Sequence, residues 1–211
     1  FVYDGAKRGY IDRNGNIVID SKKDKVWPMT SYGTVIKDSG KLYFVNRKGE
    51  IVIQPGDYDA GEMDKFNGLL ALKDNSSDKW GVFDVSTGKQ VVSFKYDSIS
   101  FAGTDRLVVV KDHVKNLINM STGKSLYSAQ TEATIEPFNS DTVTWVHTGK
   151  DAYTIIDNDG HVLFRDTNNI IEDVKSFNHG FSSVKSKGKW GVMNAKGEWV
   201  VQPTYEAVNI L

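Results

Sequence analysis

The chain has 211 residues, and its 26 basic residues nearly balance 27 acidic ones, which leaves a formal charge of −1 at pH 7. That balance excludes the overall basicity of a nucleic-acid clamp, and no apolar stretch approaches the roughly 18 residues that a membrane-spanning helix needs. The absence of cysteine excludes disulfides, a thiol nucleophile and a zinc-thiolate site. We therefore predict neither a nucleic-acid partner nor membrane insertion by this segment.

One short pattern recurs along the whole chain: two apolar residues, then Asp or Asn, then a polar stretch that ends in Gly. We call the Asp and Asn residues of this pattern the anchors: Asp12, Asn46, Asp84, Asn119, Asp157 and Asn194. Their spacing runs from 34 residues, between the first two anchors, to 38 residues, between the second and third. A period of this length predicts that residues 1–211 form a single domain of repeated units.

Each unit predicts four short strands joined by tight turns. In chain order these are a first strand such as YDSISF, which is looser in other units, an apolar strand such as LLALK, a strand such as WGVFD that ends at the anchor, and a strand such as WVV after the Gly. Asp and Asn accept hydrogen bonds from the backbone two residues on, and Gly tolerates positive φ, so we interpret the anchors as hairpin turns rather than metal ligands. Four such strands use about 35 residues and leave no room for a helix, so the predicted fold is all β.

Alignment of the units places one apolar residue in the first strand of each: Val26, Met63, Ile99, Ile135, Val174 and Val208. A second apolar position follows two or three residues later, at Met29, Phe66, Phe101, Phe138 and Phe177. The recurrence of both positions supports a first strand even where its own pattern is weak.

Two stretches resemble the repeats of bacterial WG-repeat proteins. They are KWGVFD, from Lys79 to Asp84, and GKWGVMNAKGEWVVQPTYEAV, from Gly188 to Val208. These repeats carry Lys-Trp-Gly, an apolar pair, Asp or Asn, then Gly and an apolar-Pro-Tyr-acid tail. The resemblance implies a repeat fold found in bacterial, often surface-exposed proteins, and it implies no reaction.

We predict that the units close into a six-bladed β-propeller rather than stack into a solenoid. The chain opens on residues that match a second and a third strand, and it stops in YEAVNIL, which matches a first strand. Side by side these segments would complete one blade, so that the C-terminal strand joins the N-terminal strands and closes the ring. We expect Val208 and Tyr10 to share that sheet. A solenoid would instead need polar caps at its two ends.

No catalytic motif, metal-binding motif or cofactor motif stands out. The four histidines never form the i, i+2 or i, i+4 pairs that short metal motifs use: His113, His147, His161 and His179. We therefore predict no metal site, no cofactor and no catalytic residues.

Four carboxylates precede the shared apolar position of the first strand by two residues: Asp24, Asp97, Glu172 and Glu206. Because the first strand of a propeller blade is innermost, these groups would ring one mouth of the central channel and could bind a cation or a basic partner. The alternative is structural: such carboxylates accept backbone hydrogen bonds at strand starts or pair with Lys and Arg of the next blade.

Two tryptophans depart from the repeat, Trp27 and Trp145, and they could form an aromatic surface for a sugar or a peptide. Trp145 aligns with Ala71, Val109 and Ser183, which are all smaller. The alternative is that this ring fills a gap between two blades.

The sequence thus predicts a non-enzymatic binding or scaffolding module for a protein, peptide or glycan. The rival is a carbohydrate-active or phosphoester-cleaving propeller enzyme that uses the channel carboxylates. From the resemblance, and because residue 1 is Phe rather than Met, we expect an extracellular or cell-surface bacterial protein, such as a lipoprotein, whose export signal has been removed. We expect a monomer.

Overall fold

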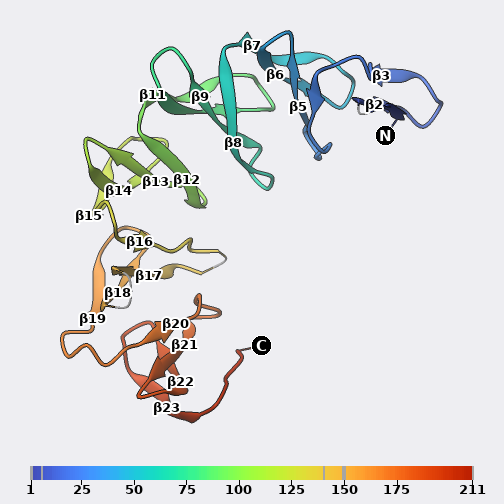
Figure 1. Ribbon diagram of the computed structural model, residues 1–211. Coiled ribbons are helices and arrows are strands. Elements are labelled where there is room, and N and C mark those ends of the chain that lie inside the picture. The colour runs from blue at the N-terminus through green and yellow to red at the C-terminus, as the bar shows by residue number, and fades with distance from the viewer. Residues whose placement is uncertain (1, 6, 140, 149–150, 211) are drawn as a thin grey trace. The chain divides into compact units, whose positions relative to one another are not determined.

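The computed structural model describes residues 2–5, 7–139, 141–148 and 151–210, and within these ranges every regular element is a strand (Figure 1). This confirms the all-β prediction. The chain divides into two compact units, residues 1–99 and 100–211. The described residues contain no helix that could cross a membrane.

The first unit holds three antiparallel sheets whose strands follow one another in chain order. The first sheet has β1 (Val2–Asp4), β2 (Lys7–Ile11) and β3 (Ile17–Ile19). The second has β4 (Lys25–Val26), β5 (Gly33–Asp38), β6 (Lys41–Asn46) and β7 (Ile51–Gly56). The third has β8 (Tyr58–Asp64), β9 (Leu69–Asp74), β10 (Lys79–Asp84) and β11 (Gln90–Tyr96).

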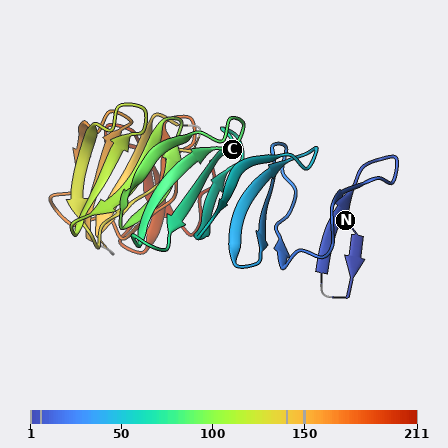
Figure 2. The same cartoon turned by 90° about the horizontal axis from the view of Figure 1, so that it is seen from above.

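The second unit holds three four-stranded sheets of the same kind, and the first strand of the first sheet crosses the boundary between residues 99 and 100. Figure 2 shows the strands from above, coloured from blue at the N-terminus to red at the C-terminus. The first of these sheets has β12 (Ser98–Gly103), β13 (Arg106–Lys111), β14 (Val114–Asn119) and β15 (Ser125–Gln130). The next has β16 (Thr134–Ile135), β17 (Val143–Thr148), β18 (Asp151–Asp157) and β19 (Val162–Arg165). The last has β20 (Asp173–Val174), β21 (Phe181–Ser186), β22 (Lys189–Asn194) and β23 (Trp199–Tyr205).

The hydrophobic core lies between neighbouring sheets within each unit. One cluster joins Phe44 of β6 to Leu72 of β9, and another joins Trp145 of β17 to Val184 of β21, all of them almost completely buried. A sheet of this kind is apolar on both faces of its middle strands, so it is stable only when each face packs against the next sheet.

The anchors form the hairpin turns that the sequence predicts. Asp12 Oδ1 accepts the backbone N–H groups of Asn14 and Asn16, both at 2.8 Å, and Asn194 Oδ1 accepts those of Lys196 and Glu198 at 2.9 and 3.0 Å. The glycines that follow all have positive φ: Gly15, Gly49, Gly88, Gly123, Gly160 and Gly197. These turns explain the sequence period, because each returns the chain from the third strand to the fourth.

The glycine of each Trp-Gly pair lies beneath a β-bulge in the fourth strand. Between the register pairs Trp190↔Tyr205 and Val192↔Val201, β23 advances four residues while β22 advances two. A Cβ atom on Gly191 would lie 2.4 Å from the carbonyl oxygen of Val201, so a side chain does not fit there. Where Asn116 replaces this glycine, the fourth strand pairs without a bulge at that point.

Three sheets have a first strand of only two residues. In each of them, a buried side-chain hydroxyl donates a hydrogen bond to the carbonyl of the residue directly after that strand. The hydroxyls of Thr34, Thr144 and Ser182 donate to the carbonyls of Trp27, Glu136 and Lys175 at 2.7, 2.9 and 2.6 Å. The two sheets with long first strands carry leucine in place of this hydroxyl residue, at Leu70 and Leu107. The position is the same because each leucine pairs with the residue that directly precedes the anchor. The hydroxyl therefore holds the chain where strand pairing stops.

The alignment of the first strands is wrong in the third sheet. Ala60, not Met63, is the equivalent of Val26, because Ala60 pairs with Leu72 just as Val26 pairs with Ile36. A bulge between Ala60 and Met63 shifts the chain, so Met63 takes the second apolar position and Phe66 is 94% exposed.

Ring closure stays a prediction. Among the described residues, the sheet of β1 to β3 has three strands, and residues 206–210 are assigned to no strand. The carbonyl oxygen of Val208 instead accepts hydrogen bonds from Lys175 Nζ at 3.1 Å and Ser183 Oγ at 3.2 Å.

Candidate functional site

Two of the four predicted channel carboxylates hold the turn between the second and third strands of their own sheet. Asp24 Oδ2 accepts the backbone N–H of Ser39 at 2.8 Å, and Glu172 Oε2 accepts that of Gly188 at 2.9 Å. Both acceptors therefore have a structural role of the kind that the alternative interpretation names.

The other two carboxylates form ion pairs with lysine. Asp97 pairs with Lys79, and Glu206 pairs with Lys189. The β-register explains these pairs. Trp190 lies opposite Tyr205, so the lysine before the tryptophan must lie opposite the acid after the tyrosine. The lysine of the Lys-Trp-Gly motif and the acid of the Tyr-acid motif are thus the two partners of one cross-strand ion pair. This pair lies within one sheet rather than between blades.

The ring of carboxylates around a channel stays a prediction. Asp24 and Asp97 belong to the first unit, whereas Glu172 and Glu206 belong to the second. Among the described residues, no three His, Asp or Glu side chains come close enough to share a metal ion.

Trp145 is not part of an aromatic surface, and that prediction is wrong. Its side chain is fully buried, its ring stacks on Phe177 with centroids 5.4 Å apart, and its Nε1 donates to Ser182 Oγ at 2.9 Å. Ser182 lies in β21 and Phe177 lies in the segment between β20 and β21, so the ring fills the space between two neighbouring sheets. The residue at this position in β13 is Val108 rather than Val109, because Val108 lies opposite Leu117, two residues before the anchor.

Trp27, in contrast, is half-buried and lines a pocket of about 370 Å³ between β4–β7 and β8–β11. The Nζ atom of Lys25 lies 4.1 Å from the centre of the Trp27 ring. The rest of the lining is mainly apolar: Pro28, Met29, Thr30, Ser31, Thr34, Val35, Ala60, Gly61, Met63, Lys65 and Leu70. We call this the apolar pocket.

Hydrogen bonds hold both rims of the apolar pocket. Tyr10 Oη donates to the carbonyl of Trp27 at 3.0 Å and accepts the N–H of Met29 at 2.7 Å. On the other rim, Tyr32 Oη donates to the carbonyl of Phe66 at 3.1 Å and so ties one sheet's loop to the next sheet's turn. The turn can adopt this form because Gly68 has a φ of +65° and leaves room for the Tyr32 ring. The pocket is therefore formed before any ligand binds.

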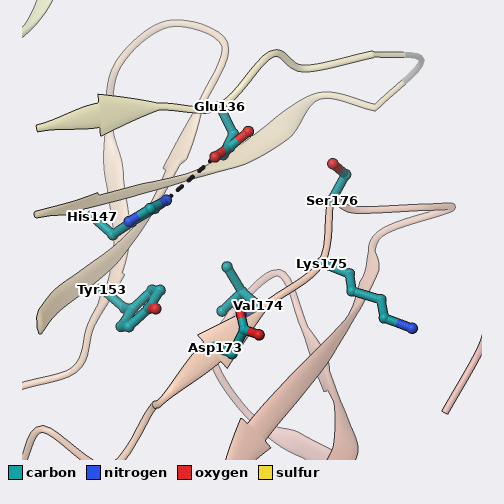
Figure 3. A pocket seen from close by; sticks show the side chains of 7 residues that line it. All are labelled: Glu136, His147, Tyr153, Asp173, Val174, Lys175 and Ser176. Atoms are coloured by element: carbon teal, nitrogen blue, oxygen red, sulfur yellow. Dashed lines mark hydrogen bonds and ion pairs between the residues drawn. The ribbon is translucent and has the colours of Figure 1, made fainter. Parts of the chain in front are cut away.

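A second pocket, of about 430 Å³, lies between β16–β19 and β20–β23 (Figure 3). His147 Nε2 lies 3.3 Å from Glu136 Oε1, and the His147 ring stacks on Tyr153 with centroids 5.2 Å apart. Asp173 and Lys175 also line it, and Figure 3 shows the Lys175 ammonium pointing away from His147. We call this the polar pocket.

The two pockets share one lining position, which is Trp27 in the apolar pocket and Glu136 in the polar pocket. Trp27 and Glu136 each follow a two-residue first strand and accept the hydroxyl of Thr34 and Thr144, respectively. One place in the repeat therefore carries an apolar side chain in one sheet and an acid in another. Sequence reasoning found Trp27 as a departure from the repeat but assigned Glu136, His147 and Phe66 to no site, because only the tertiary structure shows which side chains face a pocket.

Four stretches of the chain match the model of the family described as "WG containing repeat": residues 9–36, 44–76, 80–112 and 190–209. Together these stretches cover more than half of the chain. The chain belongs to the WG-repeat family. A search of curated proteins found no match.

Solved structures similar to this WG-repeat chain share its fold at low sequence identity. A crystal structure described as the eukaryotic initiation factor is 12% identical, with a TM-score of 0.53, and the match covers 84% of this chain and 54% of that one. KlHsv2 with loop 6CD replaced by a Gly-Ser linker is 12% identical, with a TM-score of 0.50, and the match covers 81% and 62%. The chain thus spans less than two thirds of either structure. The successive antiparallel sheets form a β-propeller-like repeat fold.

Several carboxylates of this WG-repeat chain have a pKa below the ordinary value: Asp12, Asp74, Asp84, Asp157 and Glu206. Burial raises the pKa of Asp157, but hydrogen bonds from the His161 ring and from backbone N–H groups outweigh it. The hydrogen bond and charge of Lys189 lower the pKa of Glu206. These groups are held as ionised acceptors.

The pKa shifts predict a loss of stability in acid. A carboxylate whose pKa is lower in the folded state than its ordinary 3.8 stabilises the WG-repeat fold fully above that pH, and the contribution disappears as pH falls through the folded-state pKa. The double variant Asp84→Asn/Asp157→Asn should keep the turns, because Asn46 and Asn194 already serve as anchors. Urea unfolding at pH 7 and at about pH 3 should show a smaller acid-induced loss in this variant than in the wild type. An equal loss would contradict the prediction; Asp20→Asn, at an exposed site outside the anchors, is the control.

Proposed function

We propose that this chain is a non-enzymatic binding module that holds a peptide segment of a partner protein at its apolar pocket. Phe66 carries the proposal. It is 94% exposed, although the turn that carries it is fixed by Tyr32 and by Asp64, whose Oδ1 accepts the N–H of Phe66 at 3.0 Å. A fully exposed aromatic ring on a fixed turn beside an apolar pocket is typical of an interaction surface.

The dimensions of the apolar pocket support a peptide ligand. Its volume of about 370 Å³ is at the lower end for small-molecule sites and suits one or two side chains. Phe66 extends the apolar contact beyond the pocket, as an extended peptide requires. Because both rims are already hydrogen-bonded, binding would cost little ordering of the protein.

The rival enzyme function gains no support from the described contacts of the predicted channel carboxylates. Asp24 and Glu172 accept backbone N–H groups, and Asp97 and Glu206 pair with lysines. Each carboxylate thus has a bond that accounts for its presence.

Selection of peptides from a displayed random library against the intact chain tests the binding function. Peptides that enrich should bind Phe66→Ala about tenfold or more weakly, which is the effect expected of a central aromatic contact. Val200→Ala, at a 55% exposed position in β23, should bind them as the wild type does. Failure to enrich any peptide, or equal binding to Phe66→Ala, would refute the proposal.

The closed ring is a further part of this proposal. Val26 pairs with Ile36 in β4–β5. Val2 is the equivalent of Ile36, because Val2 pairs with Gly9 and Ile36 pairs with Tyr43, and Gly9 and Tyr43 each lie three residues before an anchor. Ring closure would therefore pair Val208 with Val2 and add a fourth strand to β1–β3.

Engineered cysteines test ring closure cleanly, because the chain has none of its own. Paired β residues lie within the Cα separation that a disulfide bridges, about 4.4 to 6.8 Å. Oxidised Val2→Cys/Val208→Cys should form an intramolecular disulfide, seen by non-reducing electrophoresis and mass spectrometry, whereas Val2→Cys/Val200→Cys should not. The absence of a disulfide in the first pair would exclude this register. The extracellular or cell-surface location and the monomeric state stay proposals, and sedimentation of the purified chain tests the second.

A further inference from the structure

The apolar pocket contains one charged side chain among the described residues that line it. That residue is Lys65, which is exposed and makes no ion pair within the part of the chain that the structure describes. The remaining lining consists of apolar side chains, glycine and small hydroxyl residues. A ligand that fills this pocket therefore meets an apolar wall and a single positive charge.

A second cation, Lys25, lies against the Trp27 ring, although it does not line the apolar pocket itself. Lys25 is exposed and its Nζ atom lies over the Trp27 ring, the largest aromatic wall of the pocket. Lys25 and Lys65 are thus two cationic groups, one against the aromatic wall of the pocket and one in its lining.

Asp64, the acid that precedes Lys65 in the chain, is bound to its own turn. Asp64 Oδ1 accepts the N–H groups of Phe66 and Asn67 at 3.0 and 3.1 Å, and Asp64 Oδ2 accepts Asn67 Nδ2 at 2.7 Å. These bonds commit both oxygens of Asp64 to the turn, so the Lys65 ammonium can pair with a carboxylate of a ligand.

We infer that the apolar pocket recognises an acidic peptide in which a large apolar side chain is followed by Asp or Glu. The apolar side chain enters between Trp27 and Met63, its carboxylate neighbour meets Lys65, and the peptide backbone crosses the Phe66 ring. This assignment rests on the proposed function and adds the class of peptide to it.

Capped octapeptides of defined sequence test the class of ligand. The probes are GSSFESSG, its amide form GSSFQSSG, its basic form GSSFKSSG and GSSAESSG, which lacks the apolar side chain. The indole N–H signal of Trp27, assigned with Trp27→Phe, reports binding to the intact chain in an NMR titration. We expect GSSFESSG to bind about two- to fivefold more tightly than GSSFQSSG at low salt, which is the range of a solvent-exposed ion pair. GSSAESSG should shift the signal least.

A charge reversal completes the test. Lys65→Glu should weaken GSSFESSG and strengthen GSSFKSSG, whereas Lys48→Glu, the same change on an exposed turn away from the pocket, should change neither. Equal binding of the Glu and Gln peptides, or no shift of the Trp27 signal up to millimolar peptide, overturns the inference. If library-selected peptides lose affinity for Phe66→Ala but bind Lys65→Glu as they bind the wild type, the binding function stands and the acidic preference is refuted.

Discussion

Trp145→Ala should lower the free energy of unfolding by about 3 to 5 kcal/mol, the range for removing a large buried aromatic side chain. The ring is fully buried, stacks on Phe177 and meets Tyr153 edge-on with centroids 6.1 Å apart. Its removal leaves a cavity between two sheets, and those sheets cannot approach to close it without breaking their other contacts. Urea unfolding followed by circular dichroism measures the loss.

Two comparisons make the Trp145 prediction specific. Trp145→Phe keeps an aromatic ring against Phe177 but removes the hydrogen bond to Ser182, so it should cost less than the alanine variant. Trp27→Ala should also cost less, because Trp27 is half-buried and lines a pocket that is already open. A loss below about 1 kcal/mol for Trp145→Ala would show that the packing between these sheets is not as described.

Gly191→Ala should destabilise the fold by about 2 to 3 kcal/mol through overpacking. The added Cβ atom would lie 2.4 Å from the carbonyl oxygen of Val201 and 2.8 Å from the backbone nitrogen of Pro203. Both contacts are with backbone, so β23 must move as a whole rather than rotate a side chain aside.

Gly188→Ala is the matched control for Gly191→Ala. Gly188 has a φ of +75°, but a Cβ atom there would meet nothing within 4 Å. It should cost about 1 kcal/mol, the strain of a left-handed conformation alone. Thermal and urea unfolding of both variants separate the two effects; a greater loss for Gly188→Ala would show that the bulge is not the reason for glycine at position 191.

The four predicted channel carboxylates show which contacts a local sequence pattern predicts and which it does not. Their position two residues before an apolar residue predicts that they share a place in the repeat, and two of them, Asp24 and Glu172, do bond the same turn of their sheets. The lysine partners of Asp97 and Glu206 lie 18 and 17 residues away in sequence. Those pairs depend on the register of a third strand against a bulged fourth strand, which the sequence pattern does not specify.

The sequence by itself determined the repeat, the strand order and the six anchor turns of this chain. These features are local: a turn is made by an Asp or Asn oxygen, by backbone N–H groups within four residues, and by a glycine that accepts positive φ. The Trp-Gly motif could likewise be recognised, because its residues lie side by side.

The tertiary structure decided which departures from the repeat are buried and which face solvent. Trp145 and Trp27 are both large rings at positions where other units carry smaller side chains. The Trp145 ring is covered by Phe177, whereas the Trp27 ring lines a pocket. Phe66 matches a core position by sequence, but one bulge between Ala60 and Met63 moves it to the tip of a turn. The physical reason is that burial depends on the neighbouring sheet and on strand register, and a single extra residue changes both.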